Sequence, residues 1–140
     1  MQLTALPKPF LILIAAYFLA SLGHFAHNAE FICEYPNLPG WLTSAKVYAT
    51  WSAITAVGAA GLLMLRGSFP LLGLALVAAY AALGFDGLGH YAVAPIELHS
   101  FGANATIISE VVVAALLLSA TLYVMATRLR HRVQPADNQP

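Results

Sequence analysis

Apolar residues fill four long stretches of the chain, and short segments rich in proline, glycine and charged residues separate them. A helix that crosses a bilayer needs about 20 mostly apolar residues, each adding about 1.5 Å. Four segments meet this requirement: about Pro9–His27, Leu42–Leu65, Phe69–Val93 and Ala105–Ala126. We therefore predict an all-α integral membrane protein, an antiparallel bundle of four transmembrane helices.

Composition agrees with a membrane protein and limits the number of domains. The 140 residues are 60% hydrophobic and only 9% charged, which leaves too little polar surface to cover a soluble core. We expect one four-span membrane domain over residues 1–127, followed by a polar, disordered tail over residues 128–140. The formal net charge of +0 argues against nucleic-acid binding, so the lipid bilayer is the expected partner.

Basic residues indicate how the spans are oriented. All but Lys46 fall on one side of the four-span arrangement: Lys8, Arg66, Arg128, Arg130 and Arg132. Lysine and arginine accumulate in cytoplasmic loops, so both termini are predicted to be cytoplasmic. The chain would then lie in the cell membrane, or the inner membrane of a bacterium, with loops 28–41 and 94–104 outside.

The chemistry of the chain is concentrated near the outer ends of the predicted spans. All acidic and histidine residues except His131 and Asp137 lie between His24 and Glu110. Ionisable groups are expensive in lipid, so each needs a partner, a water-filled cavity or a function. A functional site in the outer half is therefore the default hypothesis.

Helical spacing predicts which of these residues share a level. His24, His27 and Asn28 stand at i, i+3 and i+4, so they share one face of the first span. Asp86 and Glu110 are each expected about 10 Å inside the bundle, the first with His90 at i+4. Residues from three spans are thus predicted to converge on one layer.

A metal site is the preferred interpretation of this layer. Neutral imidazole binds zinc, iron and copper, and added carboxylates favour iron or zinc over copper(I). The candidate ligands are His24, His27, His90 and His99. Asp86 and Glu110 would serve as further ligands or as catalytic acid–base groups, and Asp86 would fix the tautomer of His90. The sequence contains no His-Glu-x-x-His or Cys-x-x-Cys motif to support the metal.

A pocket for an apolar or amphiphilic small molecule is the second interpretation. A carboxyl group buried without a partner keeps its proton near neutral pH and can donate it, as Asp86 or Glu110 would here. The pocket residues would be drawn from the following set: Asn28, Tyr48, Trp51, Tyr80, Tyr91 and Asn104. The layout loosely resembles four-span sterol-isomerase-like membrane proteins of the emopamil-binding type, without a shared motif. This resemblance implies an isomerase-like enzyme.

A purely structural layer is the third interpretation. Polar contacts between membrane helices are worth about 0.6 kcal/mol each, up to roughly 2 kcal/mol, and they can fix the register of a bundle. The chain would then be an accessory subunit of a larger membrane complex. In this case Asn104 is read as the N-cap of the fourth span, and Cys33 as an idle thiol in the outer loop. The sequence does not decide between an enzyme and a binding or accessory protein.

Overall fold

The computed structural model describes residues 6–133, and this part of the chain is helical with short connections. It contains four helices that are long and apolar enough to cross a membrane: Lys8–Glu30, Ser44–Arg66, Pro70–Val93 and Phe101–Arg130. The prediction of an all-α chain with four such helices is confirmed.

The elements follow one another in a simple up-and-down order. The first two long helical segments are α1 (Lys8–Glu30) and α2 (Ser44–Arg66). The third is built from α3 (Pro70–Leu83), the 3₁₀ segment η2 (Gly84–Leu88) and α4 (Gly89–Val93). The fourth is α5 (Phe101–Val133), and two short 3₁₀ turns, η1 (Ile32–Glu34) and η3 (Ile96–Leu98), lie in the connections.

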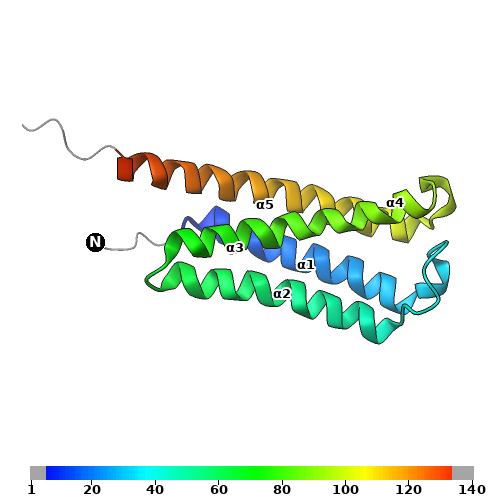
Figure 1. Cartoon of the computed structure of the whole chain (residues 1–140). Helices are drawn as coiled ribbons and strands as arrows, with labels where there is room; N and C mark the ends of the chain where they lie inside the picture. The colour runs from blue at the N-terminus through cyan, green and yellow to red at the C-terminus, as the bar shows by residue number, and fades with distance from the viewer. Residues whose placement is uncertain (1–5, 134–140) are drawn as a thin grey trace, which may run out of the picture.

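Consecutive long helical segments run antiparallel (Figure 1). Helix α1 packs against α2 and α5, and α3 packs against the same two helices. The connections 31–43 and 94–100 meet at one end of the bundle, which we call the loop end; Asn37 Nδ2 donates there to the carbonyl oxygen of Val93 at 2.9 Å. The start of α1, the α2–α3 turn and the end of α5 lie at the opposite end (Figure 1).

Local sequence explains where the helices start. Helices α1 and α3 carry proline in their first turn, where the missing N–H costs no hydrogen bond. Thr43 caps α2 by accepting the backbone N–H of Lys46. Ser100 does the same for α5, because its hydroxyl accepts the N–H of Ala103 at 3.2 Å.

The fourth helix is longer at both ends than the sequence predicted. It starts at Phe101 rather than near Ala105, so the interpretation of Asn104 as its N-cap was wrong. At the other end it continues to Val133. The first part of the predicted disordered tail, 128–133, is therefore helical, and residues 134–140 lie outside the described part of the chain.

The core is apolar in the half of the bundle away from the loop end. Its buried residues are Phe10, Ile14, Tyr17, Ile54, Leu65, Leu74, Val77, Tyr80, Ala81, Ala114 and Leu117. Small residues bring α2 and α3 very close: a Cβ on Gly73 would lie 2.6 Å from the backbone nitrogen of Leu65. Van der Waals contact of this kind stabilises helix pairs in lipid, where both partners are apolar.

Candidate functional site: a buried histidine–glutamate pair

Side chains from the first and last helices form a hydrogen-bonded pair inside the bundle. His24 Nδ1 on α1 contacts Glu110 Oε2 on α5. The two side chains are 3% and 1% exposed. Burying a lone charge costs several kcal/mol, so the pair must either share one proton or form a complete ion pair. Sequence spacing singled out both residues, and the structure brings them together.

The η2 segment packs directly on this pair. A Cβ on Gly87 would lie 3.0 Å from His24 Cε1 and 3.6 Å from Glu110 Oε2. Because Gly87 has no side chain, the backbone of η2 can lie directly against the pair.

His90 is the next polar group toward the loop end. Its ring centroid lies 5.5 Å from that of His24. Asn28 Nδ2 donates to His90 Nε2 at 3.1 Å, and this bond places the imidazole proton on the other ring nitrogen when His90 is neutral. Asn28 was predicted to bind a cofactor, and here it orients a histidine.

Asp86 occupies a different position from the one predicted. It was expected to be buried at the level of Glu110 and to fix His90, but its side chain is exposed and Asn28 contacts His90 instead. The prediction assumed a continuous α-helix, whereas Asp86 lies in η2. A 3₁₀ turn has 3.0 residues instead of 3.6, which turns the side chain away from the face that i, i+4 spacing assigns to it.

His27 takes part in a separate contact at the loop end. Its Nδ1 is hydrogen-bonded to the hydroxyl of Tyr35 at 2.9 Å, and its ring packs against Gly102 at the start of α5. Tyr35 itself is 3% exposed, and its ring centroid lies 4.8 Å from that of His90. No sequence pattern pointed to Tyr35. Helical periodicity relates residues on one face of a helix, and Tyr35 lies in the connection that follows α1.

The buried phenol of Tyr35 gives a test of this loop packing. Loss of solvent raises the pKa of Tyr35 from 10.0 to about 12, the contact with Thr106 opposes this rise, and Glu34 adds to it. The folded state thus favours the neutral phenol, so this stabilisation is complete below pH 10.0 and is lost as pH rises toward about 12.

We expect ultraviolet absorbance titration of the wild type minus Tyr35→Phe to show one phenol that ionises near pH 12. The wild type should also lose stability relative to Tyr35→Phe over the same interval. Ionisation of Tyr35 near its usual pKa would contradict the buried position.

His99 and Asn104 hold the second connection in place. His99 is 6% exposed, its Nδ1 donates to the carbonyl oxygen of Pro95 at 3.2 Å, and its ring centroid lies 6.2 Å from that of His90. Asn104 accepts from the Tyr91 hydroxyl at 2.9 Å and donates to the Ile96 carbonyl at 3.1 Å. Asn104, predicted as a cofactor-binding residue, therefore links the end of the third helical segment to the connection that follows it.

Tyr48 and Trp51 lie on α2, away from the pair. The Tyr48 hydroxyl donates to Glu30 at 2.7 Å, and the indole of Trp51 packs on Phe18 with ring centroids 5.6 Å apart. Neither residue lines an apolar cavity between α1, α2 and α3, which Tyr80 does line and which lies toward the end opposite the loop end.

A metal centre finds no support in this geometry. Among the side chains described between residues 6 and 130, no group of three or more histidine, cysteine, aspartate or glutamate residues is arranged to hold a metal ion. The predicted ligands are divided among other contacts: His24 with Glu110, His27 with Tyr35, and His90 with Asn28.

Several polar atoms around the pair have no hydrogen-bond partner among the described residues. They are His24 Nε2, Glu110 Oε1, Asn28 Oδ1, His99 Nε2 and Ser21 Oγ. Buried polar atoms are normally satisfied by protein or water. The pair and its neighbours therefore retain capacity to accept or donate further hydrogen bonds.

Comparison with known proteins adds no assignment: no protein-family model, curated protein or solved structure matches this chain.

Proposed function

We propose that this chain is a small multi-pass membrane protein that binds and releases a proton at the His24–Glu110 pair, for acid–base chemistry on one side of the membrane. The observation that carries the proposal is the pair itself, buried among apolar helices with His24 Nε2 and Glu110 Oε1 still unpartnered in the described chain. Intramembrane carboxylates and histidines commonly form proton relays.

The pair is chemically suited to hold one proton. Two charges in an apolar interior are costly, whereas one proton shared between imidazole and carboxylate leaves both groups hydrogen-bonded. Histidine then offers its second nitrogen, Nε2, for exchange with the next group.

His90 and His99 supply a route from the pair to the loop end. The ring centroids are 5.5 Å apart for His24 and His90 and 6.2 Å apart for His90 and His99. His24 Nε2 and His99 Nε2 have no hydrogen-bond partner among the described residues, so a bridging water would complete each step. The unpartnered atoms of His24, Asn28 and His99 would bind such waters.

The apolar packing in the opposite half of the bundle favours proton access to the His24–Glu110 pair from the loop end alone. Beyond the pair lie Tyr17, Tyr80, Ala114 and Leu117, all in the buried apolar core. The Tyr17 hydroxyl is already bonded to the Tyr80 carbonyl oxygen at 3.0 Å. We infer that the loop end faces outside, because Lys8, Arg66 and the arginines of α5 lie toward the opposite end.

Infrared pH-difference spectroscopy on the purified chain in lipid tests the proposal. We expect one reversible protonation, with a carboxyl signal that disappears in Glu110→Gln and shifts in His24→Gln. The exposed carboxylate variant Glu97→Gln is the control and should leave this signal unchanged.

The proposed proton route through His90 and His99 is tested separately, by the rate of hydrogen–deuterium exchange at the His24–Glu110 pair. We expect His90→Phe to slow this exchange by at least about tenfold, as loss of a positioned proton carrier should, while His27→Phe leaves it unchanged. A pair that keeps one protonation state across the whole pH range would overturn the proposal. Stoichiometric zinc, iron or copper in the purified protein, lost in His90→Ala, would restore the metal hypothesis in its place.

A further inference from the structure

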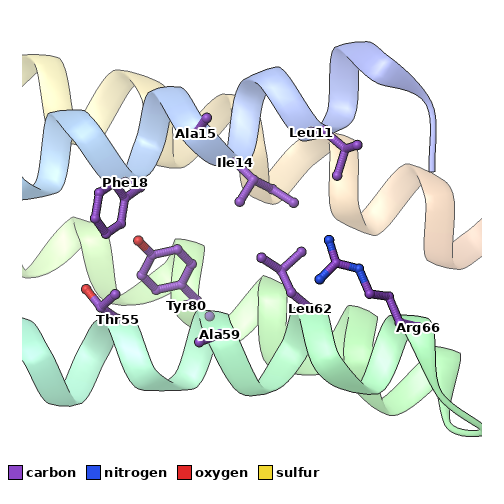
Figure 2. A pocket seen from close by; sticks show the side chains of 10 residues that line it. Leu11, Ile14, Ala15, Phe18, Thr55, Ala59, Leu62, Arg66 and Tyr80 are labelled. Carbon is purple, nitrogen blue, oxygen red and sulfur yellow. The ribbon is translucent and has the colours of Figure 1, made fainter. Parts of the chain in front are cut away.

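An apolar cavity of about 390 Å³ lies between α1, α2 and α3 (Figure 2) and is open on one side, where Leu11, Ala15 and Ala59 are exposed. Neither His24 nor Glu110 lines it. Its lining residues are Leu11, Ile14, Ala15, Phe18, Thr55, Gly58, Ala59, Leu62, Arg66 and Tyr80. Cavities of this size and character are typical of small-molecule sites. None of the acidic or histidine residues of the proton site takes part in it.

The dimensions of the cavity suit one hydrocarbon chain. Its lining extends along α2 from Thr55 to Arg66, a length of about 16 Å at 1.5 Å per residue. This equals roughly half of a 30 Å hydrocarbon core, the depth of one leaflet. Dividing about 390 Å³ by this length gives a mean cross-section of roughly 24 Å². Because non-bonded carbons pack 3.5–4.0 Å apart, there is room for one chain and not two.

A cation marks one end of the cavity. In Figure 2 the Arg66 side chain reaches from α2 toward Leu11 of α1 across this end. Arg66 makes no hydrogen bond or ion pair with the side chains described between residues 6 and 130. A guanidinium presents a planar set of donors that binds a carboxylate through two parallel hydrogen bonds.

Two hydroxyl groups mark the other end. Tyr80 and Thr55 point their hydroxyls toward Phe18, away from Arg66 (Figure 2). Both oxygens are buried, and Tyr80 is only 3% exposed. The two hydroxyls lie close enough to interact with each other, and neither has a well-formed hydrogen bond to another group of the described chain. An unsatisfied buried hydroxyl is costly, so a ligand that bonds to it gains affinity over one that does not.

We propose that this cavity binds a single-chain fatty carboxylate that carries a hydrogen-bonding group at its far end. The carboxylate lies on Arg66, the chain fills the apolar cavity, and the terminal group bonds to Tyr80 and Thr55. This site is separate from the proton site and does not depend on it.

Quenching of Trp51 fluorescence measures whether a ligand occupies the end of the cavity near Tyr80 and Thr55. Trp51 packs on Phe18, which lines the cavity. In a Trp41→Phe background in phosphatidylcholine nanodiscs, ω-bromolauric acid should quench Trp51 and saturate at one molecule per chain. ω-Hydroxylauric acid should displace it at an about tenfold lower concentration than lauric acid, since one hydrogen bond is worth about that factor. Dodecylamine, with the opposite head charge, should not displace it.

Paired variants distinguish a probe bound in the cavity from a probe in the surrounding lipid. Ala59→Leu narrows the cavity and should abolish saturable quenching, whereas Ala53→Leu, also at an exposed position but on another face of α2, should not. Arg66→Gln should weaken binding about tenfold, and Arg66→Lys should restore most of it. Circular dichroism checks that each variant is folded.

Two results would overturn the proposal. Quenching that fails to saturate, or that is equal in Ala59→Leu and Ala53→Leu, would mean that the probe occupies only the lipid annulus. Equal displacement by lauric and ω-hydroxylauric acids would show that no terminal group of the ligand bonds to Tyr80 or Thr55.

Discussion

Replacing Glu110 with leucine is expected to lower the free energy of unfolding by about 3 kcal/mol. The substitution leaves His24 Nδ1 buried without its partner, since Glu110 Oε2 is the atom it contacts. Removing one member of a buried pair costs more than the pair contributes, because the remaining polar group must stay desolvated. Denaturant titration in detergent, followed by circular dichroism, measures the change.

The double variant His24→Leu, Glu110→Leu separates stability from function. Apolar replacements of a buried pair are commonly neutral or stabilising, so most of the lost stability should return. The double variant should show no proton exchange at positions 24 and 110, because both titratable groups have been removed. Glu97→Leu, an exposed loop substitution, should change stability by less than about 0.5 kcal/mol.

A double variant as unstable as the single variant would show that leucine cannot be packed there, and the pair would then be a structural element. Recovered stability with proton uptake unchanged would contradict the proposed function. Recovered stability with uptake lost would support a pair retained for its chemistry.

Gly73→Val is expected to destabilise the bundle by about 3 kcal/mol. A Cβ at this position would lie 2.6 Å from Leu65 N and 2.8 Å from Gly61 O, and both atoms belong to the α2 backbone. Backbone cannot rotate aside as a side chain can, so α2 and α3 must separate and lose contact along their length. Thermal unfolding in detergent is the measurement.

The matched control is Gly23→Val on α1, where a Cβ would meet nothing within 4 Å. Stability there should stay the same or rise slightly, because glycine is a poor helix former. If Gly73→Val does not unfold fully, Gly73→Ala should give a smaller loss in the same direction. Equal stability of the valine variants at positions 73 and 23 would refute the close packing of α2 on α3.

The two halves of the bundle differ in character: polar groups gather in one half, and apolar side chains fill the other. The half near the loop end holds His24, His90 and Glu110, together with polar atoms that have no partner in the described chain. The other half contains the apolar core and the cavity that ends at Arg66. A titratable site and an amphiphile site can therefore coexist without sharing a residue.

The sequence by itself determined the all-helical architecture and its four long apolar helices. Runs such as Leu42–Leu65 are too long and too apolar for any other structure, because in lipid a backbone must satisfy its own hydrogen bonds. Helical spacing also identified His24 and Glu110 as important, since isolated polar residues stand out in an apolar helix.

Only the tertiary structure decided which polar residues meet. Glu110 contacts His24 across 86 positions of sequence, and no local rule specifies such a pairing. The 3₁₀ turn at η2 turned Asp86 outward, and Tyr35 entered the layer from a loop. Backbone periodicity gives the face of one helix, whereas the rotation of neighbouring helices about their axes depends on the packing of all of them.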